Sequence, residues 1–405
     1  MDDEKAFRQL LSLLRDDREA ECRAPNRAPV NWPEVLQRAG EFGLLPVLYL
    51  RAVAMPPPLR PPPEALRRLR AAHLRSAARN LRIAQDLRLI LAALRGADVP
   101  AIPLKGAHWA FLIYADPGQR AMGDLDLLVS AEALPRARQA LAAIGYAGAD
   151  LENGDHTHHE RYVAPRGAAV LELHWRLDDR DSRAGPRDLA GVWARARPAV
   201  LQGVEVLTLS PADQLVYACL HIYYHGFRVG LRHILDIAAI IEAAGDTLDW
   251  GMVESLSGQW RCARIVALLL AVARDWFTIA LPQRAATLIA QQGAGTHVAA
   301  AQRVILGRYG RTALPDIVAR LSGRRPLAEK AAVGLRKVLL PRRDIARQHG
   351  IERRPPWMVC LCVRRLLHLT AKWTIWLVAA RGHVRSLESD IRRRSTLLDW
   401  VEEVR

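Results

Sequence analysis

The chain has few cysteines for its length, and they are scattered. Five cysteines occur among 405 residues, and only Cys360 and Cys362 lie close together. One residue separates that pair, whereas the knuckles that hold structural zinc leave a gap of two or more residues. The cysteines therefore indicate neither a disulfide framework nor a zinc knuckle, and a reduced cytoplasmic environment is the simplest expectation.

Long uncharged apolar runs are missing as well. No stretch of about 18 apolar residues is free of charge, so the sequence predicts no membrane-spanning helix. The best candidate, residues 357–380, is interrupted by Arg364, Arg365 and Lys372. The opening residues, MDDEKAFRQLLSLLRDD, are charged from the second position and lack the apolar core of a signal peptide.

Several common catalytic motifs are absent. The sequence contains no G-x4-G-K-[ST] phosphate loop, no G-x-S-x-G nucleophile elbow and no Rossmann glycine fingerprint before a helix. His221 and His225 are four residues apart, but Ile222 stands where zinc proteases carry a glutamate. We expect helix packing for these histidines, with a base contact by Tyr223 or Tyr224 as the alternative.

Positive charge is abundant. The formal net charge is +16, most of it from arginine, which favours anionic partners such as nucleotides, nucleic acid or a membrane surface. An arginine-rich, lysine-poor composition is also what a GC-rich genome produces, so the charge does not decide between these interpretations. The C-terminal region mixes Trp357, Trp373 and Trp376 with basic residues. Such a segment can lie on an anionic membrane, contact RNA or pack internally.

The patterning divides the chain into four regions. Residues 1–96 and 181–310 show helical periodicity, and residues 311–405 are helical and arginine-rich. Residues 97–180 instead predict the order β-α-β-α-β-β, a small mixed sheet covered by helices. The expected fold class is therefore α+β, with a helical N-terminal segment and a larger all-α C-terminal region.

Two aspartates interrupt an apolar strand in RAMGDLDLLVS. Asp124 and Asp126 lie on one face of that strand, roughly 6.6 Å apart. Carboxylates this close repel each other, and a divalent cation such as Mg²⁺ is the natural compensation. A third carboxylate, Glu172, interrupts the strand VLELHW, where it shares a face with His174. Two metal ions could be bridged by this set of three carboxylates.

Other polar residues lie near these strands in the sequence. Lys105 and Gly106 fall between a strand and a helix. A glycine there lets the backbone approach a phosphate, the helix N-terminus offers free N–H groups to it, and Lys105 and Arg120 could add positive charge. His174 could contact phosphate or orient a carboxylate. The cluster HTHHE (His156, His158 and His159) offers metal or phosphate contacts, or simply exposed hairpin residues. Asp236 has Arg232 four residues before it and is expected to pair with it.

The order of these blocks, PLKGA, RAMGDLDLLV, GY and ELHW, resembles an uncharacterised bacterial nucleotidyltransferase family of the DNA polymerase beta-like superfamily. The specific blocks lie within residues 103–176, and the likeness extends over about residues 30–300. The resemblance implies that Asp124, Asp126 and Glu172 hold Mg²⁺ or Mn²⁺ and that Gly106 contacts the phosphates of a nucleoside triphosphate (NTP). The usual Gly-Ser turn is replaced here by Lys105-Gly106-Ala107, and the gap to Asp124 is longer.

The function that this resemblance implies is metal-dependent transfer of a nucleoside monophosphate from an NTP to an unidentified hydroxyl on a small molecule, protein or RNA. The alternative is a catalytically weak nucleotide sensor or scaffold, associated with a membrane or nucleic acid. The complete set of carboxylates favours the enzyme, and the altered glycine turn favours the alternative. A third hypothesis, a nucleic-acid-binding protein, predicts binding that weakens steeply with salt.

Overall fold

The computed structural model describes residues 2–15, 30–55, 60–148, 158–164, 167–177, 189–227, 229–307 and 384–403. The chain divides into two compact units. The larger unit comprises residues 1–149, 157–221 and 230–292, and the smaller comprises residues 150–156, 222–229 and 293–405. The expected four-part division remains a prediction.

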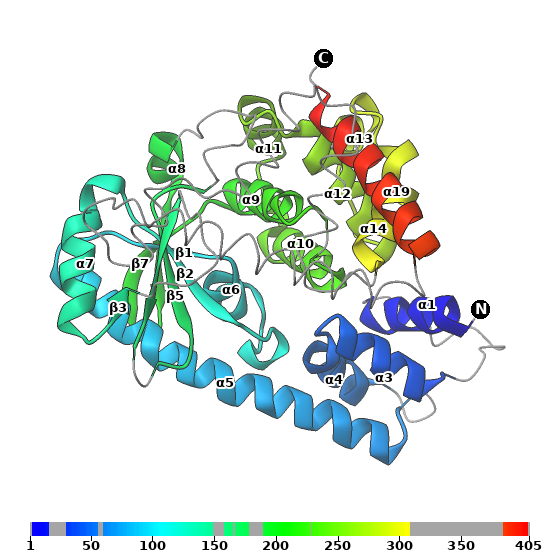
Figure 1. Cartoon of the computed structure of the whole chain (residues 1–405), viewed down its shortest axis with the longest axis horizontal. Coiled ribbons are helices and arrows are strands. Elements are labelled where there is room, and N and C mark those ends of the chain that lie inside the picture. Colours follow the sequence, from blue (N-terminus) through cyan, green and yellow to red (C-terminus); the bar gives the residue numbers. More distant parts are fainter. Residues whose placement is uncertain are drawn as a thin grey trace, which may run out of the picture. The chain divides into compact units, whose positions relative to one another are not determined.

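A five-stranded mixed sheet organises the larger unit (Figure 1). In chain order its strands are β1 (Ile102–Leu104), β2 (Asp124–Leu128), β3 (Ala147–Gly148), β4 (His159–Val163) and β5 (Val170–His174). Their spatial order is β1-β2-β5-β4-β3; β2 and β5 are parallel, and the other neighbours are antiparallel. The small mixed sheet and the helices around it confirm the predicted α+β class.

One face of this sheet packs into the core. Leu125 and Leu127 on β2 and Leu171 and Leu173 on β5 are fully buried, in one cluster with residues of the long helix α5 (Pro63–Gly96). Because side chains alternate along a strand, residues 124, 126, 172 and 174 project from the opposite face. The core face therefore determines which face carries the candidate site.

The helical N-terminal region is confirmed by four helices. They are α1 (Asp2–Leu14), α3 (Trp32–Glu41), α4 (Leu45–Ala54) and α5. Phe7 on α1 makes edge contacts with the rings of Phe42 and Trp276, which ties these helices to α12 (Ala263–Phe277). Proline at the start of α5 is tolerated because the first backbone N–H groups of a helix have no partner within the helix.

A second, two-stranded sheet follows where the sequence predicted only helices. Strands β6 (Arg197–Leu201) and β7 (Val204–Thr208) pair antiparallel. Their two-residue turn, Gln202 and Gly203, has φ angles of 53° and 77°, as a tight hairpin requires. The expectation of purely helical structure over residues 181–310 is therefore wrong at this hairpin. The hairpin lies beside β1, because Leu207 N donates to Ala101 O at 3.4 Å.

The remaining elements are mostly helical, as predicted. In the larger unit they are α6 (Lys105–His108), η2 (Trp109–Ile113), η3 (Pro117–Gln119), η4 (Ala131–Ala133), α7 (Leu134–Ala143), α8 (Leu189–Arg195), most of α9 (Pro211–Tyr224), α10 (Leu231–Ala244), η5 (Gly245–Thr247), α11 (Trp250–Gln259), α12 and α13 (Gln283–Gln291). Ser210 caps the start of α9, because the backbone N–H of Asp213 donates to Ser210 Oγ at 3.2 Å.

In the smaller unit, the described helices are η6 (Ala294–His297), α14 (Val298–Leu306) and α19 (Val384–Glu402). His297 stacks on Trp400 with ring centroids 4.0 Å apart, which joins η6 to α19.

No helix in the described part of the chain combines the length and apolarity needed to cross a membrane. Residues 357–380, with the basic and aromatic segment, lie outside the described residues. The cytoplasmic location and the peripheral membrane contact therefore remain predictions.

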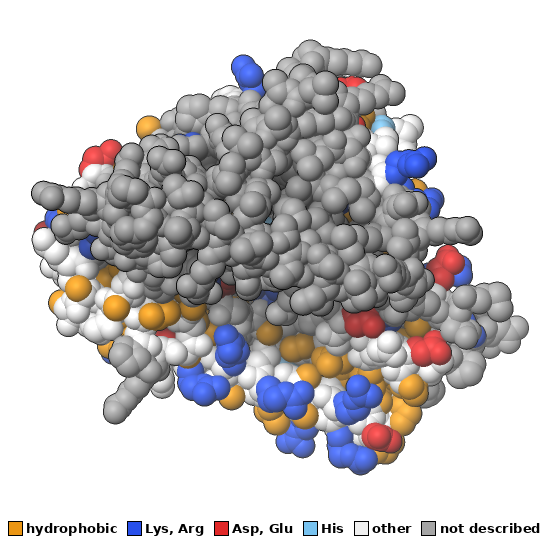
Figure 2. Space-filling view, in the orientation of Figure 1, with side chains coloured by type: hydrophobic (Ala, Val, Ile, Leu, Met, Phe, Trp, Pro, Cys, Tyr) orange, Lys and Arg blue, Asp and Glu red, His pale blue; other side chains and the backbone are white. Residues whose placement is uncertain are grey.

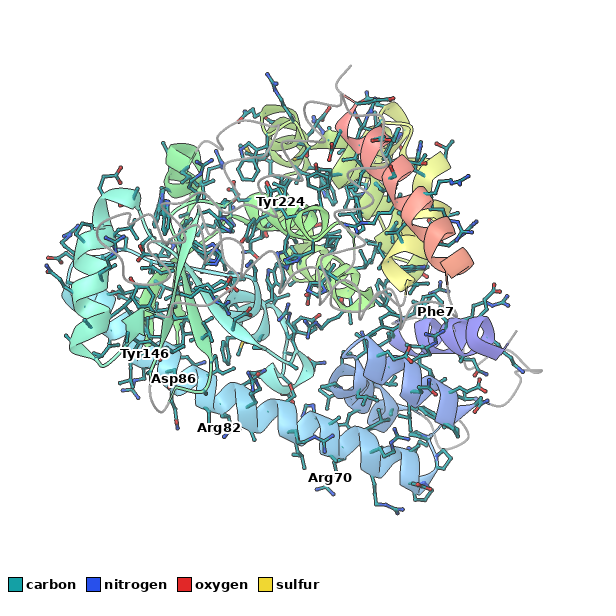
Figure 3. The ribbon with its side chains drawn as sticks, viewed as in Figure 1. Phe7, Arg70, Arg82, Asp86, Tyr146 and Tyr224 are labelled. Atoms are coloured by element: carbon teal, nitrogen blue, oxygen red, sulfur yellow. The ribbon has the colours of Figure 1, made fainter. Side chains whose placement is uncertain are left out.

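Arginines gather on the exposed side of α5, along the lower part of Figure 2. Arg70 and Arg82, labelled in Figure 3, are two of them, and exposed Leu74 and Leu81 lie between them in the sequence. The exposed arginines of α5 form a basic surface that suits an anionic partner.

The hairpin turn gives a test of this fold. Gly203→Ala should lower the free energy of unfolding by about 1–2 kcal/mol, because an L-residue pays a steric cost at a left-handed φ. Gly258→Ala in α11 is the matched control. That glycine has open space around it, so alanine should leave stability unchanged or raise it through helix propensity. Chemical denaturation of both variants measures the difference, and equal effects would contradict the turn assignment.

Candidate active site

The pairing of β2 with β5 brings the predicted acidic residues together. In the parallel register Asp126 lies opposite Glu172, and Asp124 lies opposite Val170. Asp124, Asp126 and Glu172 therefore project from the same face of two adjacent strands. The structure places all three as the sequence pattern suggested, and their role as metal ligands remains a prediction.

Asp126 is buried and lies between two cationic or hydrogen-bonding groups. Lys105 Nζ lies 2.6 Å and His174 Nε2 lies 2.9 Å from its Oδ1 atom. Burial acts to raise the pKa of Asp126, but Lys105 and His174 outweigh burial and hold it well below its ordinary value. The pKa of Lys105 is raised, because the Asp126 carboxylate outweighs the opposing effect of burial. The two groups form an ion pair at neutral pH.

The other two carboxylates differ in their surroundings. Asp124 is exposed at the start of β2, and its pKa is raised by partial desolvation and by the nearby Asp126 and Glu172. Glu172 is half-buried, with Arg161 Nε 3.4 Å from its Oε1 atom and His174 Nε2 3.7 Å from its Oε2 atom. The site therefore has an open end at Asp124 and a closed, charge-compensated end at Asp126.

Lys105 and Gly106 stand where β1 ends and α6 begins. Lys105 has a φ of 42°, in the left-handed region that is unfavourable for a non-glycine residue. A Cβ atom on Gly106 would lie 3.1 Å from Arg120 Nη1 and 3.4 Å from Met122 Cγ. Close packing therefore accounts for this glycine without a ligand. The expected helix is the four-residue α6, which the five-residue π-helical turn η2 continues, so its dipole at a phosphate would be weak.

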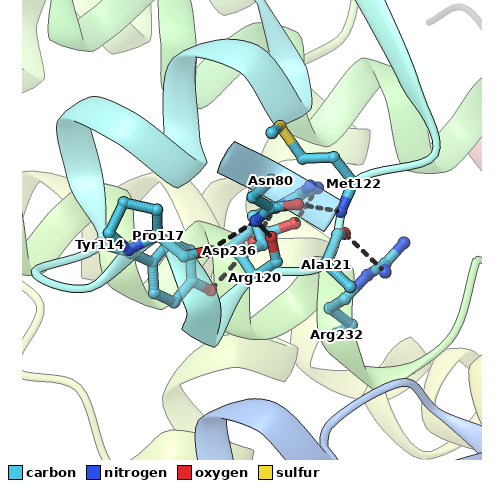
Figure 4. A network of polar contacts seen from close by, with 8 residues as sticks. All are labelled: Asn80, Tyr114, Pro117, Arg120, Ala121, Met122, Arg232 and Asp236. Carbon is cyan, nitrogen blue, oxygen red and sulfur yellow. Dashed lines mark hydrogen bonds and ion pairs between the residues drawn. The ribbon is translucent and has the colours of Figure 1, made fainter. Parts of the chain in front are cut away.

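Arg120 is engaged in the interior of the protein (Figure 4). Its Nε and Nη2 atoms donate to the two carboxylate oxygens of Asp236, each at 2.9 Å, and its guanidinium lies 5.0 Å from the centre of the Trp109 ring. Tyr114 donates its hydroxyl to Asp236 at 2.9 Å. The expected pair of Arg232 with Asp236 is wrong, because Arg232 instead donates to the Ala121 carbonyl at 3.2 Å.

The ion pair of Arg120 with Asp236 changes the pKa of the Asp236 carboxyl group. Burial acts to raise the pKa of Asp236, but Arg120 outweighs it and the pKa is lowered. Asn80 donates to the carbonyl oxygens of Pro117 and Arg120 at 2.6 and 2.8 Å (Figure 4). The segment before β2 is therefore fixed by Asn80 on α5 and by Asp236 on α10. Arg120 thus links the segment before β2 to α10. Its contact with a phosphate remains a prediction.

Histidines line the closed end of the site. His174 is buried, and the centroids of the His159 and His158 rings lie 4.8 and 5.6 Å from that of its own ring. His156 lies outside the described residues. The His221 ring lies 5.6 Å from that of His233, and Tyr223 donates to Glu402 at 2.9 Å, both in keeping with helix packing.

Sequence reasoning missed Arg161 as a member of the site. It lies opposite Glu172 in the antiparallel pairing of β4 with β5, and it shares a face with His159 because the two are separated by one residue. Knowledge of which residues pair between β4 and β5 would have identified Arg161, but the sequence alone does not show that pairing.

Comparison with protein families assigns the chain to a class. Residues 28–278 match a family described as uncharacterised nucleotidyltransferases. That range covers more than half of the 405 residues, and the chain belongs to this family of enzymes, as the resemblance in its sequence predicted. A comparison with curated proteins finds no match.

Solved structures offer distant likenesses. The solution structure of the antibiotic-resistance factor ANT(2'')-Ia is 17% identical, over 44% of this chain and 90% of that one, with a TM-score of 0.33. Its crystal structure with adenylyl-2''-tobramycin is 16% identical, over 44% and 96%, with a TM-score of 0.33. An antigenic nucleotidyltransferase-like protein from Paracoccidioides brasiliensis is 21% identical, over 48% and 93%, with a TM-score of 0.31. At these scores none of them assigns a role to a residue here.

The Arg120–Asp236 pair predicts a pH-dependent loss of stability. Asp236→Asn should lower the free energy of unfolding at neutral pH by about 3–5 kcal/mol, because it leaves a buried guanidinium without its charge partner. The folded-state pKa of Asp236 lies below its ordinary value of 3.8, so the pair contributes fully above about pH 4 and is lost as pH falls through the folded-state pKa. The gap between parent and variant should therefore narrow in acid.

Denaturant unfolding at several pH values measures this gap. Asp246→Asn is the matched control, because Asp246 is exposed and should change stability little. A gap that stays constant down to strongly acidic pH would contradict the assignment.

Proposed function

We propose that the chain transfers a nucleoside monophosphate group from an NTP to a hydroxyl acceptor, using divalent cations held by Asp124, Asp126 and Glu172. The observation that carries the proposal is the β2–β5 register, which sets Asp126 opposite Glu172 with Asp124 two residues away on the same face. Membership in a family of nucleotidyltransferases supports the reaction class.

The residues present fit a divalent cation. Asp126, Glu172 and His174 each offer a ligand atom, and these atoms all lie within 4.8 Å of one another. The ammonium of Lys105, 2.6 Å from Asp126, shows that this carboxylate already faces a cation. Mg²⁺ or Mn²⁺ suits a set dominated by carboxylates, and such ions neutralise charge on the phosphates and align the α-phosphate for attack.

The chain's own residues divide the remaining tasks. Lys105 holds Asp126 in its ionised form, with its Nζ atom 2.6 Å from the carboxylate. The same ammonium group can contact a phosphate of a nucleotide bound at the site. His174 fixes the orientation of Asp126 through the bond from its Nε2 atom. Arg161 orients Glu172 from the neighbouring strand. Asp124, at the exposed end, is placed where a substrate can arrive from solvent.

Loss of Asp124 tests the proposal with little risk to folding, because its side chain is exposed. Asp124→Asn should reduce nucleotidyl transfer about a hundredfold or more by removing a metal ligand. Purified protein would be given each α-labelled NTP in turn, Mg²⁺ or Mn²⁺, and a cell extract as the source of acceptor. Label transfer and pyrophosphate release are followed, with Asp246→Asn as a control that retains activity.

The double variant Asp124→Asn/Asp126→Asn should abolish transfer completely. If the parent protein shows neither transfer nor metal-dependent NTP binding, the catalytic proposal is overturned. Transfer that survives in the double variant would show that the carboxylates are not the metal ligands.

A nucleotide sensor or scaffold is the second candidate, and one contact favours it. Lys105 lies 2.6 Å from the buried oxygen of Asp126, so an ammonium already supplies the charge that a metal ion would bring. If the ammonium is a permanent replacement for the ion, the site can bind nucleotide without catalysing transfer.

Lys105→Met distinguishes the two candidates. In the enzyme, Mg²⁺ alone should raise the melting temperature of the variant more than that of the parent, because Asp126 has lost its resident cation. The KM for NTP should rise about tenfold, because a cation near the phosphates is lost. In the sensor, neither protein gains stability from Mg²⁺ and neither transfers label. Thermal unfolding with and without Mg²⁺, together with the transfer assay, separates these outcomes.

A further inference from the structure

Three histidines gather beside the carboxylates. His158 precedes β4, His159 begins β4 and His174 ends β5, where His159 and His174 lie directly opposite in the antiparallel pairing. One ring nitrogen from each of the three lies within 4.8 Å of the others. The pairing of the two strands thus collects imidazoles that are 15 residues apart in sequence, from His159 to His174.

Burial and exposure are unequal within this imidazole cluster (His158, His159 and His174). His159 and His174 are buried, and His158 is partly exposed. A metal ion binds the lone pair of a neutral imidazole nitrogen, and the buried pair lies where three rings converge. His158 provides the side from which an ion can enter.

The tautomer of His174 follows from its partner. Asp126 is ion-paired with Lys105 and is therefore a carboxylate that can only accept, so His174 Nε2, at 2.9 Å, carries the proton. His174 Nδ1 then has a lone pair. That atom is buried and makes no hydrogen bond within the part of the chain that the structure describes. Histidines that bind a metal ion through one ring nitrogen commonly donate the N–H of the other ring nitrogen to a carboxylate, as His174 does to Asp126.

We propose that His158, His159 and His174 form a site for Zn²⁺ or a similar imidazole-binding transition-metal ion. This site adjoins the carboxylate site, because His159 Nε2 and His174 Nε2 lie 3.9 and 3.7 Å from the carboxylate oxygens of Glu172. Nitrogen ligands suit Zn²⁺ and not Mg²⁺, which prefers oxygen. Zn–N bonds of about 2.0–2.1 Å require the rings to close in by small side-chain rotations. Three protein ligands leave one coordination position open, as in zinc sites that bind an exchangeable ligand.

This inference does not rest on nucleotidyl transfer. It needs the imidazoles and the Asp126–His174 bond, whereas transfer needs Asp124, Asp126 and Glu172 together, so Asp126 is common to both sites. Because His174 contacts Asp126, an ion at the imidazole cluster would also hold the Asp126 carboxylate in place from its buried side.

His158→Ala is the variant that tests the site, because His158 is the partly exposed member and precedes the strand. Metal-free parent and variant are titrated with Zn²⁺ by calorimetry and with Co²⁺ followed by its visible absorption. The parent should bind one ion in the imidazole cluster with the absorption of a tetrahedral nitrogen site. The variant should bind that ion at least about 10–100-fold more weakly and lose the absorption. His225→Ala, which removes an exposed histidine elsewhere, is the matched control and should behave like the parent.

Asp124→Asn separates this site from the carboxylate site. It should leave Zn²⁺ affinity and the Co²⁺ spectrum unchanged while it removes transfer. The proposal is overturned if the parent gives no tetrahedral Co²⁺ spectrum, if His158→Ala binds Zn²⁺ as tightly as the parent, or if Asp124→Asn abolishes the bound ion. Circular dichroism of each variant confirms that folding is retained.

Discussion

The hydrogen-bonded pairing of β2 with β5 sets the position of the acidic side chains in the candidate site. Leu125 and Leu127 on one strand and Leu171 and Leu173 on the other are fully buried, so a slip of one residue would exchange them with carboxylates. Desolvating unpaired carboxylates costs several kcal/mol each, which excludes that alternative register. The burial of these leucines therefore sets which side chains project from the polar face of the sheet.

The negative charges of two buried carboxylates, Asp126 and Asp236, are each balanced by a cationic side chain, and both cations come from one short segment. Lys105 pairs with Asp126 and Arg120 pairs with Asp236, both close to the connection between β1 and β2. The first pair lies within the candidate site, and the second joins the chain before β2 to α10. These ion pairs account for the two cationic side chains of the segment. They also show that a lysine or arginine close to a carboxylate site can be bound to a carboxylate of the protein, whether or not it contacts a phosphate.

Sequence patterning identified a large part of this arrangement. Alternation along RAMGDLDLLVS and VLELHW identified the strands, the shared face of the acidic residues and the burial of the opposite face. It did not reveal the β6–β7 hairpin, whose turn, Gln202-Gly203, is marked only by one glycine between short apolar segments. It also assigned Asp236 to its neighbour Arg232, because spacing along a helix is visible in a sequence and a contact across 116 residues is not.

The sequence by itself determined the fold class, the family and the shared strand face of Asp124, Asp126 and Glu172, because period-two alternation and short motif blocks are local properties. The tertiary structure decided which cation meets which carboxylate, since that depends on strand register and on segments that meet only after folding. In the folded chain Lys105 forms an ion pair with Asp126, Arg120 forms one with Asp236, and the rings of His158 and His159 lie beside that of His174. Burial strengthens each of these interactions, and burial is a property of the folded chain alone.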